Sequence, residues 1–350
     1  MRFHSHAVLA VAFLISNVAC MRSSSVRPPA QISGPIVIAH RGASGHRPEH
    51  TVAAYALAIA MGADFIEPDL VSTSDGVLVA RHENEIGGTT DVAAKFPDRK
   101  RRKTIDGDTV SGWFTEDFTL AELRTLRARE RLAFRSHAYD GQFAIPTFDD
   151  VLALADSAGR RRGRVVGVYP ETKHPSYFRA LGLPLEPRLL TALRAHGLDR
   201  ADAPVFIQSF EVGNLRALHR ATRVRLVQLV AGGERPYDFV VSGDARGFNE
   251  LLTPAGLREI ATYADAIGAN TRLIVGPLAT SVPTSLLRDA HAAGLRVHVW
   301  TLRPEANFLS ARYAGDPLAE VRELAAMGAD GLFGDYPDQL VRGLGRMAGR

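Results

Sequence analysis

Apolar and polar residues follow two different periods along most of this chain. From residue 35 onward, short runs of β-branched and other apolar residues, which we predict to be strands, are separated by amphipathic stretches of helical periodicity. The predicted strands are 36–40, 65–70 (with 78–82 following), 165–170, 205–210, 226–230, 264–268, 296–301 and 331–334. The predicted helices include 52–61, 148–158, 187–195, 212–221, 283–293 and 317–327. Strands and helices in alternation are typical of parallel βα units.

The number of these units and the position of their polar residues favour a closed barrel. Eight strand–helix repeats over roughly 300 residues match the size of a (β/α)8 TIM barrel. The alternative, a doubly wound open sheet, would gather functional residues at one switch point, whereas a barrel collects them in a ring at the carboxyl ends of its strands. Almost every predicted strand ends in a residue capable of chemistry, namely His40 and Arg41, Glu67 and Asp69, His82, Glu171 and Lys173, Gln208, Trp300, and Asp335. We therefore predict an α/β fold of the TIM-barrel class over residues 35–345.

One segment interrupts the alternation after the second strand. Residues 85–146 are rich in Asp, Arg and Gly, and only 120–127 has a clear helical pattern. We predict an insertion packed over one rim of the barrel. Two roles stay open for it, a lid over the site and a structural cap without substrate contact.

The N-terminal region predicts export. The apolar run 7–15 follows a basic residue and is too short to span a bilayer, so we assign 1–20 to a secretory signal peptide. Residues 21–34, rich in Ser, Arg and Pro, are typical of a flexible tether. Cys20 stands where a bacterial lipoprotein carries its lipid, and both lipidation and plain cleavage after Ala19 stay open. We expect an exported, periplasmic protein with Cys20 as a candidate membrane tether.

Composition narrows the functional classes. The 350 residues are 46% apolar, which is enough for a large core, and the net charge is only +4. Basic residues are not gathered with aromatic residues on one element, which argues against a nucleic-acid partner. Cys20 is the only cysteine, so the folded domain has neither an internal disulfide nor a thiol nucleophile. Nothing in the pattern indicates an oligomeric state.

The loop after the first predicted strand has the densest set of reactive residues. His40 can move a proton, Arg41 can clamp a phosphate through two hydrogen bonds, and Glu49 can bind a metal or orient a neighbour. His82, at the end of an apolar stretch in the same early βα unit, supplies a second imidazole. Two histidines can divide the work of removing and donating a proton.

Three carboxylates end two of the predicted strands. Glu67 and Asp69 point to the same face because the side-chain period of a strand is two, and Glu171 arrives at the end of the third strand with Lys173 beside it. Buried like charges repel unless they share a cation, and an all-oxygen set suits Ca2+ or Mg2+. The alternative is an ion pair with an Arg or Lys of a neighbouring strand. No His–Cys cluster or HExxH motif supports zinc.

Together these motifs resemble one enzyme family. The string HRGASG..PEHT is followed by GADFIEPDL, by a T-x-DG-x-LV turn with a strand-ending histidine, by YPE-x-K, and by GLFGDYPD. This order and spacing is similar to that of the glycerophosphodiester phosphodiesterases, most of all the longer periplasmic type, which shares a TTDVAAKFPDR-like segment and an IQSF-like strand. The resemblance extends from Ile36 to Val341.

The resemblance implies a (β/α)8 barrel that hydrolyses glycerophosphodiesters, such as glycerophosphocholine, to glycerol 3-phosphate and an alcohol. It implies one divalent cation, with Ca2+ favoured over Mg2+, and a small-molecule substrate. The roles it implies are catalysis for His40 and His82, metal binding for Glu67, Asp69 and Glu171, substrate binding for Arg41, Lys173, Gln208 and Trp300, and support for Glu49 and Asp335. Two competing hypotheses are a phospholipase C or D type barrel acting on intact lipid and a non-catalytic surface lipoprotein.

Overall fold

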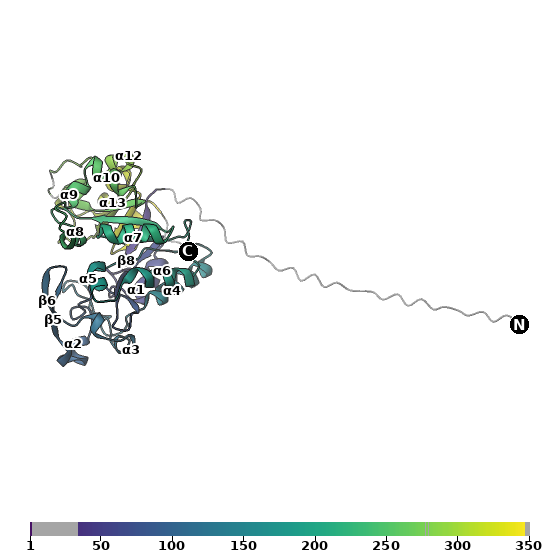
Figure 1. Cartoon of the computed structure of the whole chain (residues 1–350). Coiled ribbons are helices and arrows are strands. Elements are labelled where there is room, and N and C mark those ends of the chain that lie inside the picture. The colour runs from purple at the N-terminus through teal and green to yellow at the C-terminus, as the bar shows by residue number, and fades with distance from the viewer. Residues whose placement is uncertain (2–33, 277, 279, 347–350) are drawn as a thin grey trace.

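The computed structural model of the chain describes residue 1, residues 34–276, residue 278 and residues 280–346 (Figure 1). Most of the predicted signal peptide, nearly all of the predicted tether, and Cys20 lie outside the described residues. Within the described residues, no helix is long and apolar enough to cross a membrane.

Eight parallel strands form a closed ring. Two of them are interrupted, so the ring consists of β1 (Ile36–His40), β2 (Phe65–Glu67) with β3 (Asp69–Ser72), β7 (Gly167–Val168) with β8 (Glu171–Thr172), β9 (Phe206–Ser209), β10 (Arg225–Val230), β11 (Ala266–Asn270), β12 (Arg296–Leu302) and β13 (Gly331–Gly334). Each strand pairs in parallel with the next, and β1 closes the ring by pairing with both β2 and β13. The predicted barrel is confirmed, and the open sheet is wrong. The sixth strand begins two residues later than predicted.

The two interruptions fall at prolines. Pro68 separates β2 from β3, and Pro170 lies between β7 and β8. Proline has no N–H to donate, so the ladder of hydrogen bonds breaks locally. The strands still stay side by side across the gap, because the Tyr169 amide donates to the Ile66 carbonyl at 2.9 Å. The residues on either side of each gap therefore keep their place in the ring.

Helices cover the outside of the barrel. The six predicted helices are present as α1 (Val52–Ala60), α4 (Phe148–Arg162), α6 (Leu185–Ala195), α7 (Val212–Ala221), α12 (Leu286–Ala292) and α13 (Pro317–Ala326). The longest, α4, begins with a capping box in which Thr147 and Asp150 satisfy each other's amides, and it ends at Gly163 in the left-handed conformation. Among the described residues, seven shorter helices were not predicted, namely α2 (Val92–Lys95), α5 (Pro175–Ala180), α8 (Tyr237–Ser242), α9 (Phe248–Leu251), α10 (Pro254–Ile260), α11 (Thr271–Val275) and α14 (Pro337–Gly343).

The segment 85–146 follows β4 (Leu78–Ala80), which pairs antiparallel with β3, and contains a hairpin of β5 (Arg101–Ile105) and β6 (Asp108–Gly112). Asp106 and Gly107 form its two-residue turn, both with positive φ, as such hairpin turns require. The helix expected at 120–127 is wrong in its second half, because α3 (Leu120–Leu123) ends after four residues. Figure 1 shows β5, β6, α3 and α2 (Val92–Lys95) grouped on one side of the barrel.

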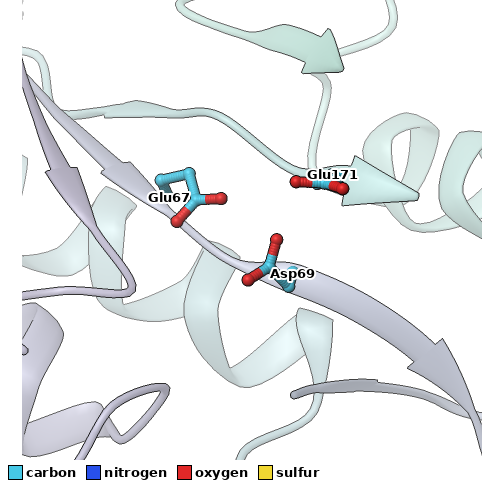
Figure 2. A group of neighbouring side chains, drawn as sticks. All are labelled: Glu67, Asp69 and Glu171. Atoms are coloured by element: carbon cyan, nitrogen blue, oxygen red, sulfur yellow. The ribbon is translucent and has the colours of Figure 1, made fainter. Parts of the chain in front are cut away.

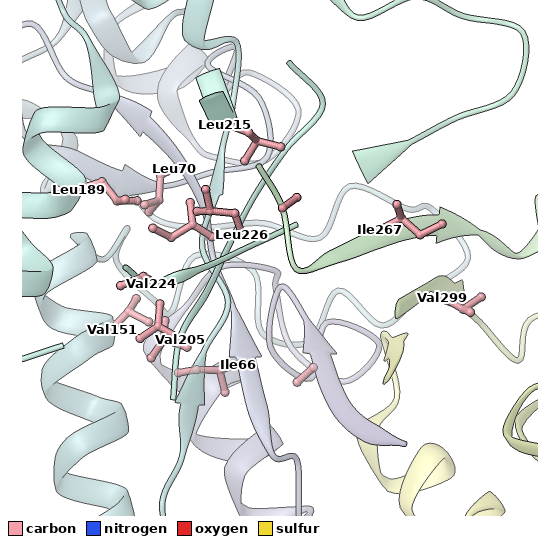
Figure 3. Packing of buried hydrophobic residues seen from close by; sticks show 14 of the residues in the cluster. Ile66, Leu70, Val151, Leu189, Val205, Leu215, Val224, Leu226, Ile267 and Val299 are labelled. Carbon is pink, nitrogen blue, oxygen red and sulfur yellow. The ribbon is translucent and has the colours of Figure 1, made fainter. Parts of the chain in front are cut away.

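Apolar side chains fill the barrel on both sides of its strands. Ile66, Leu70 and Leu226 belong to the large cluster between the strands and the surrounding helices (Figure 3). A second, smaller cluster is formed by residues that alternate with those of the large cluster along the strands, namely Ile38, Phe65, Tyr169, Phe206, Val227, Ala266 and Phe333. Because successive side chains of a strand point to opposite faces, this second cluster fills the inside of the barrel.

Candidate active site

Three buried carboxylates meet at the carboxyl ends of two neighbouring strands. Asp69 and Glu171 are paired residues of β3 and β8, and Glu67 ends β2. One oxygen of each lies within 4.8 Å of the others, and Figure 2 shows the three carboxylates turned toward a common space. Their exposed fractions are 1%, 0% and 6% for Glu67, Asp69 and Glu171. The structure thus brings all three predicted metal ligands together.

Neighbouring donors hold two of these carboxylates in place. Glu67 accepts a hydrogen bond from the Arg41 amide at 2.7 Å and another from the Gln208 side-chain amide at 3.0 Å. Asp69 Oδ2 accepts a hydrogen bond from His50 Nε2 at 2.9 Å. The other oxygen of Asp69 is buried and has no hydrogen-bond partner among the described residues. An unpartnered buried carboxylate oxygen is costly unless a cation completes its coordination.

Lys173 lies beside the third carboxylate, with its Nζ 3.2 Å from a Glu171 oxygen. The alternative expected from the sequence, a lysine or arginine neutralising the acidic group, is therefore present in part, because Arg41 Nε also lies 3.4 Å from Asp69. Neither cation contacts Glu67 through its side chain in the described structure. Lysine and arginine therefore neutralise only part of the group.

The negative charges of the three carboxylates repel one another. Burial raises the pKa of Glu67 well above its usual range, and the charges of Asp69 and Glu171 add to the shift. Burial likewise raises the pKa of Glu171 to about 8. Two oxygens that each lie about 2.3–2.6 Å from a calcium ion can be at most about 5 Å apart, so the three side chains can reach one ion. The donor set, its burial and the unpartnered Asp69 oxygen all fit a divalent cation.

His40 is held from one side by a carboxylate. Its Nδ1 lies 2.6 Å from Asp335 Oδ1, and Asp335 Oδ2 accepts hydrogen bonds from Arg135 and Arg303, both at 2.7 Å. Burial lowers the pKa of His40 to about 4, and the Arg41 charge contributes to the shift. The pKa of Asp335 stays well below its usual range despite burial, because His40 and the two arginines favour its charge. A neutral His40 therefore donates its Nδ1 proton to Asp335 and keeps a lone pair on Nε2.

His82 has a similar partner but a more open position. Its Nδ1 lies 2.8 Å from Glu83 Oε1, and 32% of its side chain is exposed, against 12% for His40. Burial, Arg41 and Lys173 lower the pKa of His82.

A cavity of about 340 Å³ opens at this end of the barrel. Of the predicted site residues, those that line it are His40, Arg41, Glu67, His82, Glu171, Gln208 and Trp300. Trp300 packs edge-on against Phe210, another residue of the cavity lining, with ring centroids 5.9 Å apart. The cavity thus has a charged side, where phosphate chemistry can occur, and an aromatic side.

The other predicted site residues lie behind this cavity or beside it. Glu49 accepts hydrogen bonds from Arg41 at 2.9 Å and from Arg131 at 3.0 Å, so it orients the arginine of the cavity wall. Lys173 lines a neighbouring cavity of about 480 Å³, which shares Glu171 with the first. The side-chain amide of Gln208, expected to contact substrate, donates to Glu67.

Sequence reasoning did not identify four residues that hold the site together. His50 supports Asp69, Arg131 supports Glu49, and both Arg135 and Arg303 support Asp335. His50 could have been found, because it lies in the same loop as His40 and Glu49. The three arginines lie in irregular segments, where no periodic pattern indicates which way a side chain points.

Comparisons with known proteins agree with this geometry. A model of the Glycerophosphoryl diester phosphodiesterase family matches residues 40–339. A glycerophosphodiester phosphodiesterase of Arabidopsis thaliana is 36% identical over 333 residues, covering 90% of this chain and 87% of the plant protein. A glycerophosphodiester phosphodiesterase of Haemophilus influenzae is 31% identical over 363 residues, covering 94% of this chain and 96% of the bacterial protein.

Solved structures support the fold. The crystal structure of a glycerophosphodiester phosphodiesterase from Agrobacterium tumefaciens gives a TM-score of 0.57 at 21% identity and covers 88% of this chain and 99% of that one. A phosphodiesterase of Oleispira antarctica, solved in complex with the product sn-glycerol-3-phosphate, gives a TM-score of 0.56 at 19% identity and covers 89% of this chain and 97% of that one. The chain therefore belongs to the glycerophosphoryl diester phosphodiesterase family and is an enzyme, a phosphoric diester hydrolase.

Proposed function

We propose that this enzyme hydrolyses glycerophosphodiesters such as glycerophosphocholine and glycerophosphoethanolamine to glycerol 3-phosphate and an alcohol, with one divalent cation and with His40 and His82 as general base and general acid. The observation that carries the proposal is the arrangement at the barrel mouth, where three carboxylates able to share an ion lie beside a cavity lined by both histidines. The product bound to the Oleispira antarctica phosphodiesterase supports the choice of substrate.

The proposed cation is Ca2+ in preference to Mg2+, held by Glu67, Asp69 and Glu171. Calcium accepts irregular sets of carboxylate oxygens, whereas magnesium demands near-octahedral geometry and keeps more of its water. When bound, the ion would supply positive charge where negative charge develops on the phosphoryl oxygens. Arg41, which lines the same cavity, would add a fixed positive charge from the protein.

His40 is suited to accept a proton. With a pKa of about 4 it is unprotonated near neutral pH, and its hydrogen bond to Asp335 fixes the tautomer that leaves Nε2 free. The proton would come from the nucleophile, which we propose to be the neighbouring glycerol hydroxyl of the substrate. Attack by that hydroxyl gives a cyclic phosphate, which water then opens. Asp335 stabilises the imidazolium that forms on His40.

His82 would protonate the departing alcohol. This role requires a proton on His82 in the complex, although its pKa is lowered in the free protein. An anionic phosphodiester in the cavity raises the pKa of a neighbouring imidazole, and Glu83 favours the charged form in the same way. Because the two histidines must start in opposite protonation states, the activity should depend on pH as a bell-shaped curve.

The direct test is release of glycerol 3-phosphate from glycerophosphocholine, measured before and after a chelator and again with Ca2+ or Mg2+ restored. We expect the release to stop with chelator and to return more fully with Ca2+. His40→Ala and His82→Ala should abolish it, whereas Asp108→Asn, at an exposed position in β6, should not. Release that persists through chelation, or a flat profile from pH 5 to 9, would contradict the proposal. Intact phosphatidylcholine, assayed alongside, separates this activity from that of a phospholipase.

The N-terminal region supports a separate proposal on location. The apolar run 7–15 after a basic residue is the reason to propose export to the periplasm, with lipid attached at Cys20. Mass spectrometry of the protein from a bacterial host tests this proposal. A chain that begins at residue 20 with added lipid mass is expected, and a chain that retains residues 1–19 contradicts export.

A further inference from the structure

Two side chains of the segment 85–146 end chains of polar contacts that begin at the two histidines of the cavity. On one side, Asp106 contacts His174, His174 contacts Glu83, and Glu83 contacts His82. On the other side, Arg135 contacts Asp335, and Asp335 contacts His40. Neither Asp106 nor Arg135 lines the cavity that holds the histidines.

The series of polar contacts that ends at Asp106 is continuous and joins distant parts of the sequence. Successive polar atoms are 2.8 Å apart from His82 to Glu83, 2.8 Å from Glu83 to His174, and 2.6 Å from His174 to Asp106. Glu83 uses one oxygen for each histidine, although 47% of its side chain is exposed. A carboxylate held at both oxygens loses its freedom to rotate, and the histidine that it contacts is fixed with it.

The middle of this chain carries a charge that suits its position. Burial lowers the pKa of His174, but the hydrogen bonds to Asp106 and Glu83 outweigh burial and raise the pKa to about 9. His174 is then an imidazolium that donates both N–H groups, one to each carboxylate. Two further cations face these residues: Lys173 acts on both Glu83 and His82, and Arg41 acts on His82. Asp106 lies in the turn between β5 and β6, so the hairpin brings it to His174.

The series of polar contacts that ends at Arg135 is shorter and more deeply buried. The Arg135 side chain is 5% exposed and bridges Asp335 and Glu305, both at 2.7 Å. Asp335 has one oxygen on His40 and the other on the two arginines, so its carboxylate plane is fixed by contacts on both sides. Arg303 comes from the barrel itself, from the loop after β12, whereas Arg135 comes from the segment 85–146.

We propose that the segment 85–146 is a positioning element, in which Asp106 fixes His82 through His174 and Glu83, and Arg135 fixes His40 through Asp335. This inference rests on the proposed roles of the two histidines and extends them. It gives the segment a function that neither a lid nor a structural cap would have. The two chains are independent of each other, so each can be broken alone.

The test is a pair of double-mutant cycles on kcat. Asp106→Ala should lower kcat about tenfold with little change in KM, and the same substitution should have almost no effect when Glu83 is already Ala, because residues that act through one path are not additive. Arg135→Gln should likewise lower kcat about tenfold, and have almost no effect in an Asp335→Asn background. Arg135→Lys, which keeps the charge, should recover part of the loss.

Two controls separate positioning from folding and from the proposed function. Asp108→Ala alters the same hairpin at an exposed position and should leave kcat unchanged, and circular dichroism with thermal unfolding checks each variant. If His40→Ala and His82→Ala remain active, the proposed function fails. If those variants are inactive while Asp106→Ala and Arg135→Gln change kcat less than twofold, or if their effects add to those of Glu83→Ala and Asp335→Asn, the positioning role is overturned and the proposed function stands.

Discussion

Two layers of side chains inside the same barrel have opposite chemistry. On six of the eight strands, the inner layer consists of Ile38, Phe65, Tyr169, Phe206, His298 and Phe333. Two residues further along each of these six strands lies the layer at the mouth, which consists of His40, Glu67, Glu171, Gln208, Trp300 and Asp335. Since the side-chain period of a strand is two, the members of each pair point to the same side of the strand.

The aromatic and polar groups of the inner layer find their partners within the layer. Tyr169 stacks on Phe206 with ring centroids 5.1 Å apart, and its hydroxyl forms a hydrogen bond of 2.6 Å with His298 Nδ1. The layer at the mouth is also largely buried, but its carboxylates repel each other and one Asp69 oxygen has no partner among the described residues. Two residues along a strand therefore separate a core that stabilises the fold from a mouth whose carboxylates suit a divalent cation.

We expect the greatest effect from a substitution at the mouth that removes activity and leaves the fold intact. His40→Ala removes the proposed base, and loss of such a group costs about 10²- to 10⁴-fold in rate. The fold should survive, because His40 is on the surface of the cavity and its partner Asp335 keeps Arg135 and Arg303. Release of glycerol 3-phosphate and thermal unfolding, measured together, check this. A variant that loses stability as much as activity would show that the two layers are not separable.

The reciprocal substitution breaks the inner layer. Phe206→Ala deletes a ring that is 1% exposed, and truncation of a buried phenylalanine costs about 3–5 kcal/mol of unfolding free energy. Below its melting temperature the variant should keep kcat within a few fold. Urea unfolding measures the stability. A loss below about 1 kcal/mol would mean that the layer contributes little to the fold.

A pH change should act on the inner layer through His298. Burial lowers the pKa of this histidine to about 3, whereas an unfolded chain binds the proton near pH 6.5. Between these values the unfolded state binds more protons, so stability is lost as the pH falls. From pH 7 to pH 5 the loss from this group is about 2 kcal/mol. Urea unfolding of wild type and His298→Gln at both pH values isolates it, and equal losses in the two proteins would contradict the account.

We expect only a small gain in stability when one of the three carboxylates at the mouth is neutralised. In metal-free protein at pH 8, Glu67→Gln removes one of the opposing carboxylates while keeping its shape. The variant should be more stable than wild type by about 1 kcal/mol, since relief of buried like charge is stabilising. Thermal unfolding in chelator measures the difference. A destabilised variant would indicate that the charges of the three carboxylates are already neutralised without an ion. Glu305→Gln, outside the three carboxylates, is the control.

Much of this arrangement could be predicted because it depends on strand periodicity. The eight strands, the ring of polar residues at their ends and the three carboxylates follow from alternation along short apolar runs. The short helices α8 to α11 escaped prediction because each has fewer than eight residues and spans too few turns to show a period.

The supporting contacts could not be predicted for a different reason. Arg135 meets Asp335 across 200 residues of sequence, and His174 meets Asp106 across 68. Such contacts depend on where loops fold in three dimensions, which no local pattern encodes. Gln208 lines the cavity, but the hydrogen bond from its side-chain amide to Glu67 was not predicted, because the hydrogen-bonding direction of a side chain depends on neighbours from other strands.

The proposed activity depends on one divalent cation held by Glu67, Asp69 and Glu171. Calorimetric titration of metal-free protein with Ca2+ tests it most directly, with Asp335→Asn as a matched control, since Asp335 is also a buried carboxylate at the mouth but is neutralised by arginines. The account predicts one site per chain in wild type and in Asp335→Asn, and no site in Asp69→Asn or Glu171→Gln. Wild-type protein that binds no Ca2+ or Mg2+ and remains active in chelator would contradict it.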